Sequence, residues 1–155
     1  MSLRELADRD RVLLDVGARD AVGALGAAAD AAARRLGIEA RGAVSALMER
    51  ERLGSTAVGN GFAIPHCKID GLPGVDLSLV RLADQVDFAA PDDSPVRFLF
   101  VVLSPAGQPA AHLKVLSQIA RILKRPQLRQ ELLAAVDADH VIAALLRAAD
   151  AEGLS

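Results

Sequence analysis

The chain reads RERLGSTAVGNGFAIPHC from Arg50 to Cys67, and this stretch is the most informative part of the sequence. Its charged beginning has helical character and stops at Gly54, and a glycine-rich turn follows. The apolar run Phe62-Ala63-Ile64 reads as a strand that delivers Pro65 and His66 to an edge. Because proline fixes φ, it presents the next side chain stiffly. A rigidly held neutral imidazole is a competent nucleophile, which makes His66 the leading candidate for a reactive residue.

Two further residues are candidates for a site around His66. Arg50 is permanently charged and has the fork geometry that binds two phosphate oxygens, but from the residues alone a solvated helix end is the favoured interpretation. His112 follows Pro109 near the predicted start of a helix, where free backbone N–H groups attract phosphate. It equally suits a half-buried position on the inner face of that helix, and His66 itself could be a surface residue. The residues alone leave these alternatives open.

The stretch resembles the enzyme IIA domains of the bacterial sugar phosphotransferase system, of the fructose, mannitol and nitrogen-regulatory type. The resemblance rests on four motifs in order: Arg50-Glu51, Gly54-Ser55-Thr56, Gly59-Asn60-Gly61 and Ala63-Ile64-Pro65-His66. It continues to His112-Leu113-Lys114-Val115-Leu116 and covers residues 11 to 148. The asparagine at position 60 favours the nitrogen-regulatory branch, because the mannitol-type domain has a glutamate there.

The resemblance implies a phosphocarrier, and hence a phosphotransferase. His66 would accept a phosphoryl group from a small phosphohistidine carrier protein (HPr-like), and His112 and Arg50 would complete the catalytic set by stabilising the phosphoryl oxygens. Arg52 is a weaker candidate for the charge partner. Transfer from one imidazole to another needs no cofactor or metal, and the chain has neither a nucleotide-binding Gly-x-x-x-x-Gly-Lys-Ser/Thr loop nor a zinc-ligand spacing. Cys67 stands where a small residue, commonly glycine, is expected.

The resemblance to enzyme IIA domains leaves several functions open. A regulatory protein is favoured, because no IIB domain and no membrane-embedded IIC segment is fused to the domain. A sugar-specific IIA component that passes phosphate to a separate IIB protein is the first alternative, and a non-catalytic binding module of the same fold is the second. An unrelated hydrolase that uses His66 has no Gly-x-Ser-x-Gly motif to support it.

Composition limits the partners and the location. Net charge is −2 and the chain has no Trp or Tyr, so we expect no nucleic-acid partner. No stretch of about 18 apolar residues is present, so no membrane insertion is expected. The first residues lack the pattern of a signal peptide, and a single cysteine fits a reducing compartment. Together these features predict a cytoplasmic protein.

The pattern of elements predicts an α/β fold, a three-layer sandwich with a small mixed β-sheet between helices. We expect residues 1–10 to be loosely ordered, residues 11–150 to form one domain, and residues 151–155 to be a tail. A connection as short as residues 71–74 cannot hold a crossover helix, so the sheet cannot be purely parallel. Strands are expected at 12–16, 62–64, 75–82 and 96–103, and helices at 20–36, 40–52, 109–124, 126–136 and 139–149.

Overall fold

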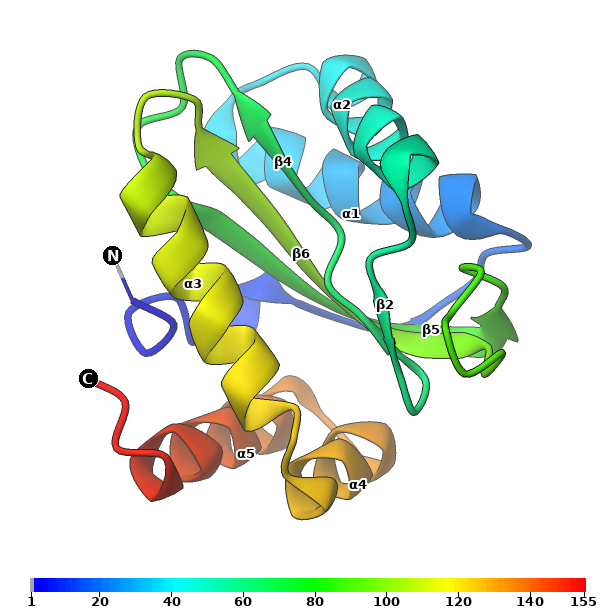
Figure 1. Cartoon of the computed structure of the whole chain (residues 1–155), viewed down its shortest axis with the longest axis vertical. Helices are drawn as coiled ribbons and strands as arrows, with labels where there is room; N and C mark the ends of the chain where they lie inside the picture. Colours follow the sequence, from blue (N-terminus) through cyan, green and yellow to red (C-terminus); the bar gives the residue numbers. More distant parts are fainter. Residues whose placement is uncertain (1) are drawn as a thin grey trace.

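The computed structural model describes residues 2–155, and Met1 lies outside the described residues. The elements, in chain order, are a short 3-10 helix η1 (Arg9–Arg11), β1 (Val12–Val16), α1 (Ala21–Leu36), α2 (Ala40–Leu53), β2 (Ala57–Gly59), β3 (Phe62–Ala63), β4 (His66–Ile69), β5 (Asp76–Val86), β6 (Val96–Pro105), α3 (Pro109–Ile122), α4 (Pro126–Ala134) and α5 (Ala138–Ala151). Helices α1 and α2 cover one face of the sheet, and α3, α4 and α5 lie on the other (Figure 1). The predicted three-layer α/β fold is confirmed.

Within residues 2–155 six strands form one mixed sheet in the order β1-β5-β6-β3-β2, with β4 also paired to β6. The long strand β6 is antiparallel to β5 and parallel to both β3 and β4. Strands β3 and β4 follow the same edge of β6 and are separated by Ile64 and Pro65. Since proline has no N–H to donate, the ladder is interrupted there. His66 is therefore the first residue of the resumed strand.

Strand β6 explains how the sheet builds two cores. Its side chains alternate between the faces, as the period of a strand requires. Phe98, Phe100 and Val102 belong to the apolar cluster beneath α3, α4 and α5, whereas Leu99 and Val101 belong to the cluster beneath α1 and α2. The near-continuous apolar run of this strand predicted burial on both faces, and that prediction is confirmed.

The amino-terminal segment differs from the expectation. We predicted loose order for residues 1–10 because they are rich in charge, but Leu3 and Leu6 are fully buried in the cluster beneath α3 and α5. The Leu3 N–H also donates to Oε1 of the buried Gln118 at 2.8 Å. Two leucines three residues apart supply enough apolar surface to fix a charged segment. At the other end α5 runs to Ala151, and Leu154 packs against the same cluster.

None of the helices in the described part of the chain, residues 2–155, is both long enough and apolar enough to cross a bilayer.

Candidate active site

The imidazole of His66 is fixed by the backbone just before it. Its Nδ1 lies 2.7 Å from the carbonyl oxygen of Ile64, and the side chain is half-buried. A carbonyl oxygen only accepts hydrogen bonds, so Nδ1 carries the proton in this contact. The lone pair of the neutral ring is therefore on Nε2. The local fold therefore leaves Nε2 as the nitrogen of His66 with a free lone pair.

A chain of hydrogen bonds holds Ile64 in place. The Ile64 N–H donates to the carbonyl of Thr56 at 2.9 Å. The Thr56 N–H donates to the carboxylate of Glu51 at 3.2 Å, and the Thr56 hydroxyl hydrogen-bonds the same carboxylate. Glu51 lies in the last turn of α2, so this helix positions the strand that orients His66. Glu51 and Thr56, which both belong to the sequence motifs, therefore support the backbone that orients the imidazole.

His112 comes from the other layer of the fold. It lies in the first turn of α3, just after Pro109, and is almost fully buried. Its ring centroid is 5.5 Å from that of His66, with an interplanar angle of 52°. Its Nδ1 lies 2.5 Å from Oγ of Ser104, a buried residue near the end of β6. The structure therefore brings together the two histidines that the sequence pointed to.

Arg50 reaches the same place from the end of α2. Its Nη1 donates to the carbonyl of Gly54 at 2.8 Å, so it also caps the carbonyl end of its own helix. The side chain is partly exposed, and among residues 2–155 no hydrogen bond to its other N–H groups is found. Arg50 therefore satisfies a helix end, and its place in the lining of the cleft with His66 is compatible with the predicted role as a charge partner, which stays a prediction.

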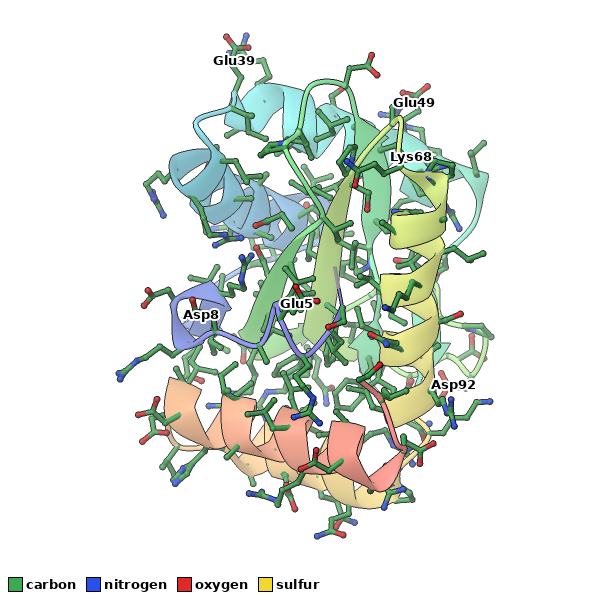
Figure 2. All side chains as sticks on the ribbon, turned by 90° about the vertical axis from the view of Figure 1, so that its left-hand side faces the viewer. Glu5, Asp8, Glu39, Glu49, Lys68 and Asp92 are labelled. Carbon is green, nitrogen blue, oxygen red and sulfur yellow. The ribbon has the colours of Figure 1, made fainter. Side chains whose placement is uncertain are left out.

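One open cleft of about 440 Å³ joins these side chains. It is lined by Ala46, Glu49, Arg50, Leu53, His66, Cys67, Lys68 and His112. Figure 2 shows Glu49 and Lys68 at the same end of the molecule, beside the start of α3. The sequence did not single out Lys68, which is two residues after His66 in β4 and therefore shares its face of the strand.

The electrostatics of the cleft keep both imidazoles neutral at pH 7. Burial lowers the pKa of His66 below its ordinary 6.5, and the positive charge of Arg50 lowers it further, against opposing effects of the Ile64 carbonyl and Glu51. Burial also lowers the pKa of His112, and the positive charge of Lys68 and the charge that His66 carries when protonated lower it further. Neutral rings offer one lone pair and one N–H each, which are the groups that nucleophilic attack and hydrogen bonding require.

Cys67 does not join this chemistry. Its side chain is buried, and burial raises the pKa of the thiol to about 12. Because the thiolate is the nucleophilic form, this cysteine is unreactive near neutral pH.

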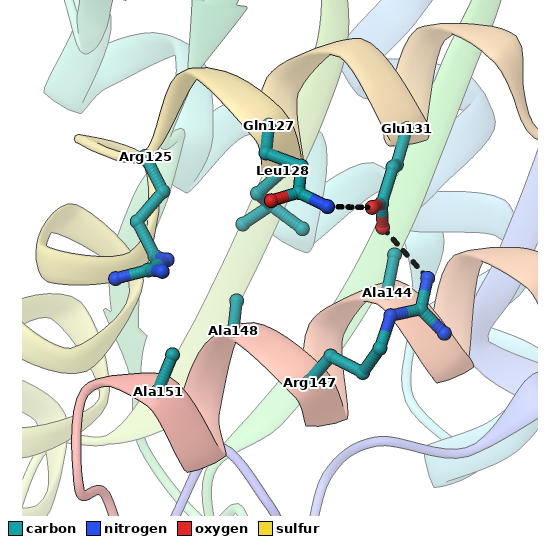
Figure 3. A pocket seen from close by; sticks show the side chains of 8 residues that line it. All are labelled: Arg125, Gln127, Leu128, Glu131, Ala144, Arg147, Ala148 and Ala151. Carbon is teal, nitrogen blue, oxygen red and sulfur yellow. Dashed lines mark hydrogen bonds and ion pairs between the residues drawn. The ribbon is translucent and has the colours of Figure 1, made fainter.

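A second hollow, of about 170 Å³, lies between α4 and α5 (Figure 3). Its charged side chains are engaged with one another: Glu131 accepts from Gln127 at 3.0 Å and from Arg147 at 2.7 Å. None of the three site residues predicted from the sequence lines it. His140, the remaining histidine, is exposed on α5 beside Asp137. The candidate site is therefore the cleft that contains His66 and His112.

Comparison with known proteins identifies the family. Residues 5–148 match the model of the phosphoenolpyruvate-dependent sugar phosphotransferase system, EIIA 2. A nitrogen regulatory protein of Bradyrhizobium diazoefficiens is 40% identical over 114 residues, which are 74% of each chain. A fructose-specific EIIA component of Haloferax volcanii is 41% identical over 93 residues, 60% of each chain. The crystal structure of the nitrogen regulatory protein IIA-Ntr from Neisseria meningitidis superposes with a TM-score of 0.87 at 29% identity, covering 92% of this chain and 98% of that one. The resemblance read from the motifs is thus confirmed, and the chain belongs to the EIIA type-2 family of the sugar phosphotransferase system.

Proposed function

We propose that this protein is a phosphocarrier whose His66 accepts a phosphoryl group from a phosphohistidine carrier protein. The observation that carries the proposal is the 2.7 Å contact between Nδ1 of His66 and the Ile64 carbonyl, which leaves the Nε2 lone pair as the attacking group. The half-buried ring has a lowered pKa, so the nucleophilic neutral form is the main form at pH 7.

The proposed reaction is an exchange of one N–P bond for another. The lone pair of His66 Nε2 forms a bond to phosphorus while the N–P bond of the donor imidazole breaks, and the donor nitrogen keeps that electron pair. Negative charge spreads over the three equatorial oxygens in the transition state. Arg50 and His112 supply hydrogen-bond donors to those oxygens, and Lys68 adds positive charge at the rim of the cleft.

We assign the protein to the nitrogen-regulatory branch, in which the phosphorylation state is itself the output. The relative from Bradyrhizobium and the solved structure from Neisseria both carry nitrogen-regulatory names, and Asn60 points the same way. Phosphorylation adds a charge of about −1.5 to −2 at the mouth of the cleft. A regulatory partner that docks over His66 would therefore bind the two forms with different affinity.

A sugar-specific role is the second candidate, because one relative of similar identity is a fructose-specific EIIA component. In that role the phosphoryl group passes on to the cysteine of a separate IIB protein. A chase experiment separates the two: phosphorylated protein is mixed with IIB proteins of the same organism, and loss of label from His66 is followed in time. Rapid transfer to a IIB protein supports the transport role, and retention supports regulation.

A non-catalytic binding module is the third candidate. It would have no need for two neutral imidazoles and an arginine with free donors around one cleft, so this arrangement favours transfer.

The test of the main proposal is incubation with phosphoenolpyruvate, enzyme I and the cognate carrier, followed by intact mass spectrometry. We expect one added phosphoryl group that is lost in acid and stable in base. His66→Ala should take up none and should keep the fold, since the ring is only half-buried. His140→Ala is the matched control, because it removes an exposed histidine that does not line the cleft, and it should label fully. Full labelling of His66→Ala would refute the proposal.

A further inference from the structure

Ser104 has a role that its sequence context does not suggest. It belongs to the row of β6 side chains that faces α3, after Phe98, Phe100 and Val102, and it is fully buried. Its Oγ lies 2.5 Å from Nδ1 of His112. Among residues 2–155 this is the only hydrogen bond that the Ser104 hydroxyl makes. The buried hydroxyl and the imidazole are therefore each other's partners at this contact.

The direction of this hydrogen bond follows from counting donors. A hydroxyl has one proton to place, and a neutral imidazole has one N–H. If Nδ1–H of His112 donated to Ser104, the hydroxyl proton would have no acceptor in the described structure. A buried donor left without a partner destabilises the fold, because it loses its hydrogen bonds to water and gains none in return. If Ser104 donates to a bare Nδ1, its proton is used, and the imidazole proton is on Nε2.

We propose that Ser104 is a positioning residue that holds His112 in the tautomer with its proton on Nε2, so that His112 donates to the phosphoryl group on His66. This inference rests on the proposed function and assigns a cause to one part of it. His112 lines the cleft, and Nδ1 is occupied by Ser104. The group that the ring offers to the cleft is therefore Nε2–H.

The two histidines are then distinguished by what holds their Nδ1 atoms. A carbonyl oxygen, which only accepts, forces His66 to carry its proton on Nδ1 and to present a lone pair. A hydroxyl that donates forces His112 into the opposite tautomer. Their rings lie 5.5 Å apart in one cleft, yet one becomes the nucleophile and the other the donor. Without Ser104, nothing holds His112 in this tautomer, and a His112 ring that presents a lone pair would repel the phosphoryl oxygens.

The tautomer is measured directly on the unphosphorylated protein. In ¹⁵N-labelled wild-type protein, long-range ¹H–¹⁵N spectra distinguish the protonated from the bare nitrogen of each neutral ring. We expect His66 protonated on Nδ1 and His112 protonated on Nε2 at pH 7.5. Ser104→Ala should shift His112 toward the other tautomer or a mixture. Wild-type His112 protonated on Nδ1 overturns the inference, whatever the variants do.

Transfer kinetics then test the consequence. Single-turnover transfer from the phosphorylated carrier should be slower in Ser104→Ala, by no more than the roughly 10²–10³-fold expected when the His112 donor is lost in His112→Ala. Ser104→Thr keeps the hydroxyl and should restore both the tautomer and part of the rate. Ser78→Ala is the matched control: Ser78 is also buried in the sheet, but its hydroxyl accepts from Arg35 on the opposite side. It should change neither the tautomer nor the rate.

The outcomes separate this inference from the proposed function. If His66 is phosphorylated but Ser104→Ala transfers at the wild-type rate, the positioning role is wrong and the phosphocarrier role stands. If the tautomers are as expected but His66 takes up no phosphoryl group, the phosphocarrier role is wrong, and the effect proposed for Ser104 on transfer is wrong with it.

Discussion

At the scale of single residues, the two histidines of the cleft differ in the group that holds Nδ1, which is the Ile64 carbonyl at His66 and the Ser104 hydroxyl at His112. His66, His112 and Arg50 were predicted as site residues because the motifs that contain them resemble those of the enzyme IIA family, whereas their residue types alone left other roles open. Ser104 was not, since the sequence shows it only as the end of an apolar strand. Its contact with His112 depends on α3 crossing the face of β6, and nothing in the local sequence encodes that distance. Lys68 was missed because the short strand that holds it was not predicted.

Arg50 gives the first prediction at this scale. Arg50→Ala should slow single-turnover transfer by about 10²–10³-fold, as for other sites that lose one electrostatic donor. Arg50→Lys should recover only part of the loss, because a point charge cannot bind two oxygens as a fork. Arg52→Ala, which removes a neighbouring exposed charge outside the cleft lining, is the control and should keep the wild-type rate. A wild-type rate in Arg50→Ala would reduce Arg50 to a helix cap.

The lowered pKa of His66 predicts the direction of its pH dependence. Protonation removes the Nε2 lone pair, so the reactive form is the neutral one. Because the pKa lies below 6.5, the ring stays neutral as pH falls through 6.5, where a free histidine would be half protonated. We expect the capacity to accept phosphate to persist below pH 6.5 and to fall only at the lower pKa. An NMR titration of His66 alone checks this without the donor; a midpoint at or above 6.5 contradicts it.

At the scale of elements, the helices were predictable because their ends are marked in the sequence. Asp20 and Gly37 delimit α1 as expected: the Asp20 carboxylate accepts from the Gly23 N–H at 2.8 Å, and Gly37 has φ of 68°. The strands β2 and β4 were not predicted. They have three and four residues, too few to show a clear alternation of their own. Strand β2 forms a local hairpin with the two-residue strand β3, whereas β4 pairs with β6, which lies far along the chain.

The cap of α1 provides a prediction about stability. Asp20→Ala leaves the Gly23 N–H without its side-chain acceptor and should lower the free energy of unfolding by about 1 kcal/mol, within a range of about 0.5–2 kcal/mol. Asp30→Ala is the matched control, since Asp30 is an exposed acid inside the same helix. Urea unfolding of both variants measures the difference. Equal stabilities would mean that the contact contributes nothing to the helix.

At the scale of the whole molecule, the class of the fold was predictable but the order of its strands was not. Alternating helices and apolar strands, with one connection too short for a crossover, already require a mixed sheet between helices. The order β1-β5-β6-β3-β2 depends on which edges meet over long separations in sequence. The packing of the first residues was missed for the same reason, because their charges alone suggested a solvated end. Their two leucines are buried by α3 and α5, which lie more than a hundred residues later.

This packing makes the amino-terminal segment part of the stability of the molecule. Leu6 is fully buried beneath α3 and α5, so Leu6→Ala should lower the free energy of unfolding by about 2–5 kcal/mol. Val136→Ala, at an exposed apolar residue, is the control and should change it by less than about 0.5 kcal/mol. Leu6 is absent from the cleft lining, so phosphorylation of the folded variant should proceed at the wild-type rate. If Leu6→Ala unfolds at the same urea concentration as Val136→Ala, the segment is loosely attached in solution, as its charge alone had suggested.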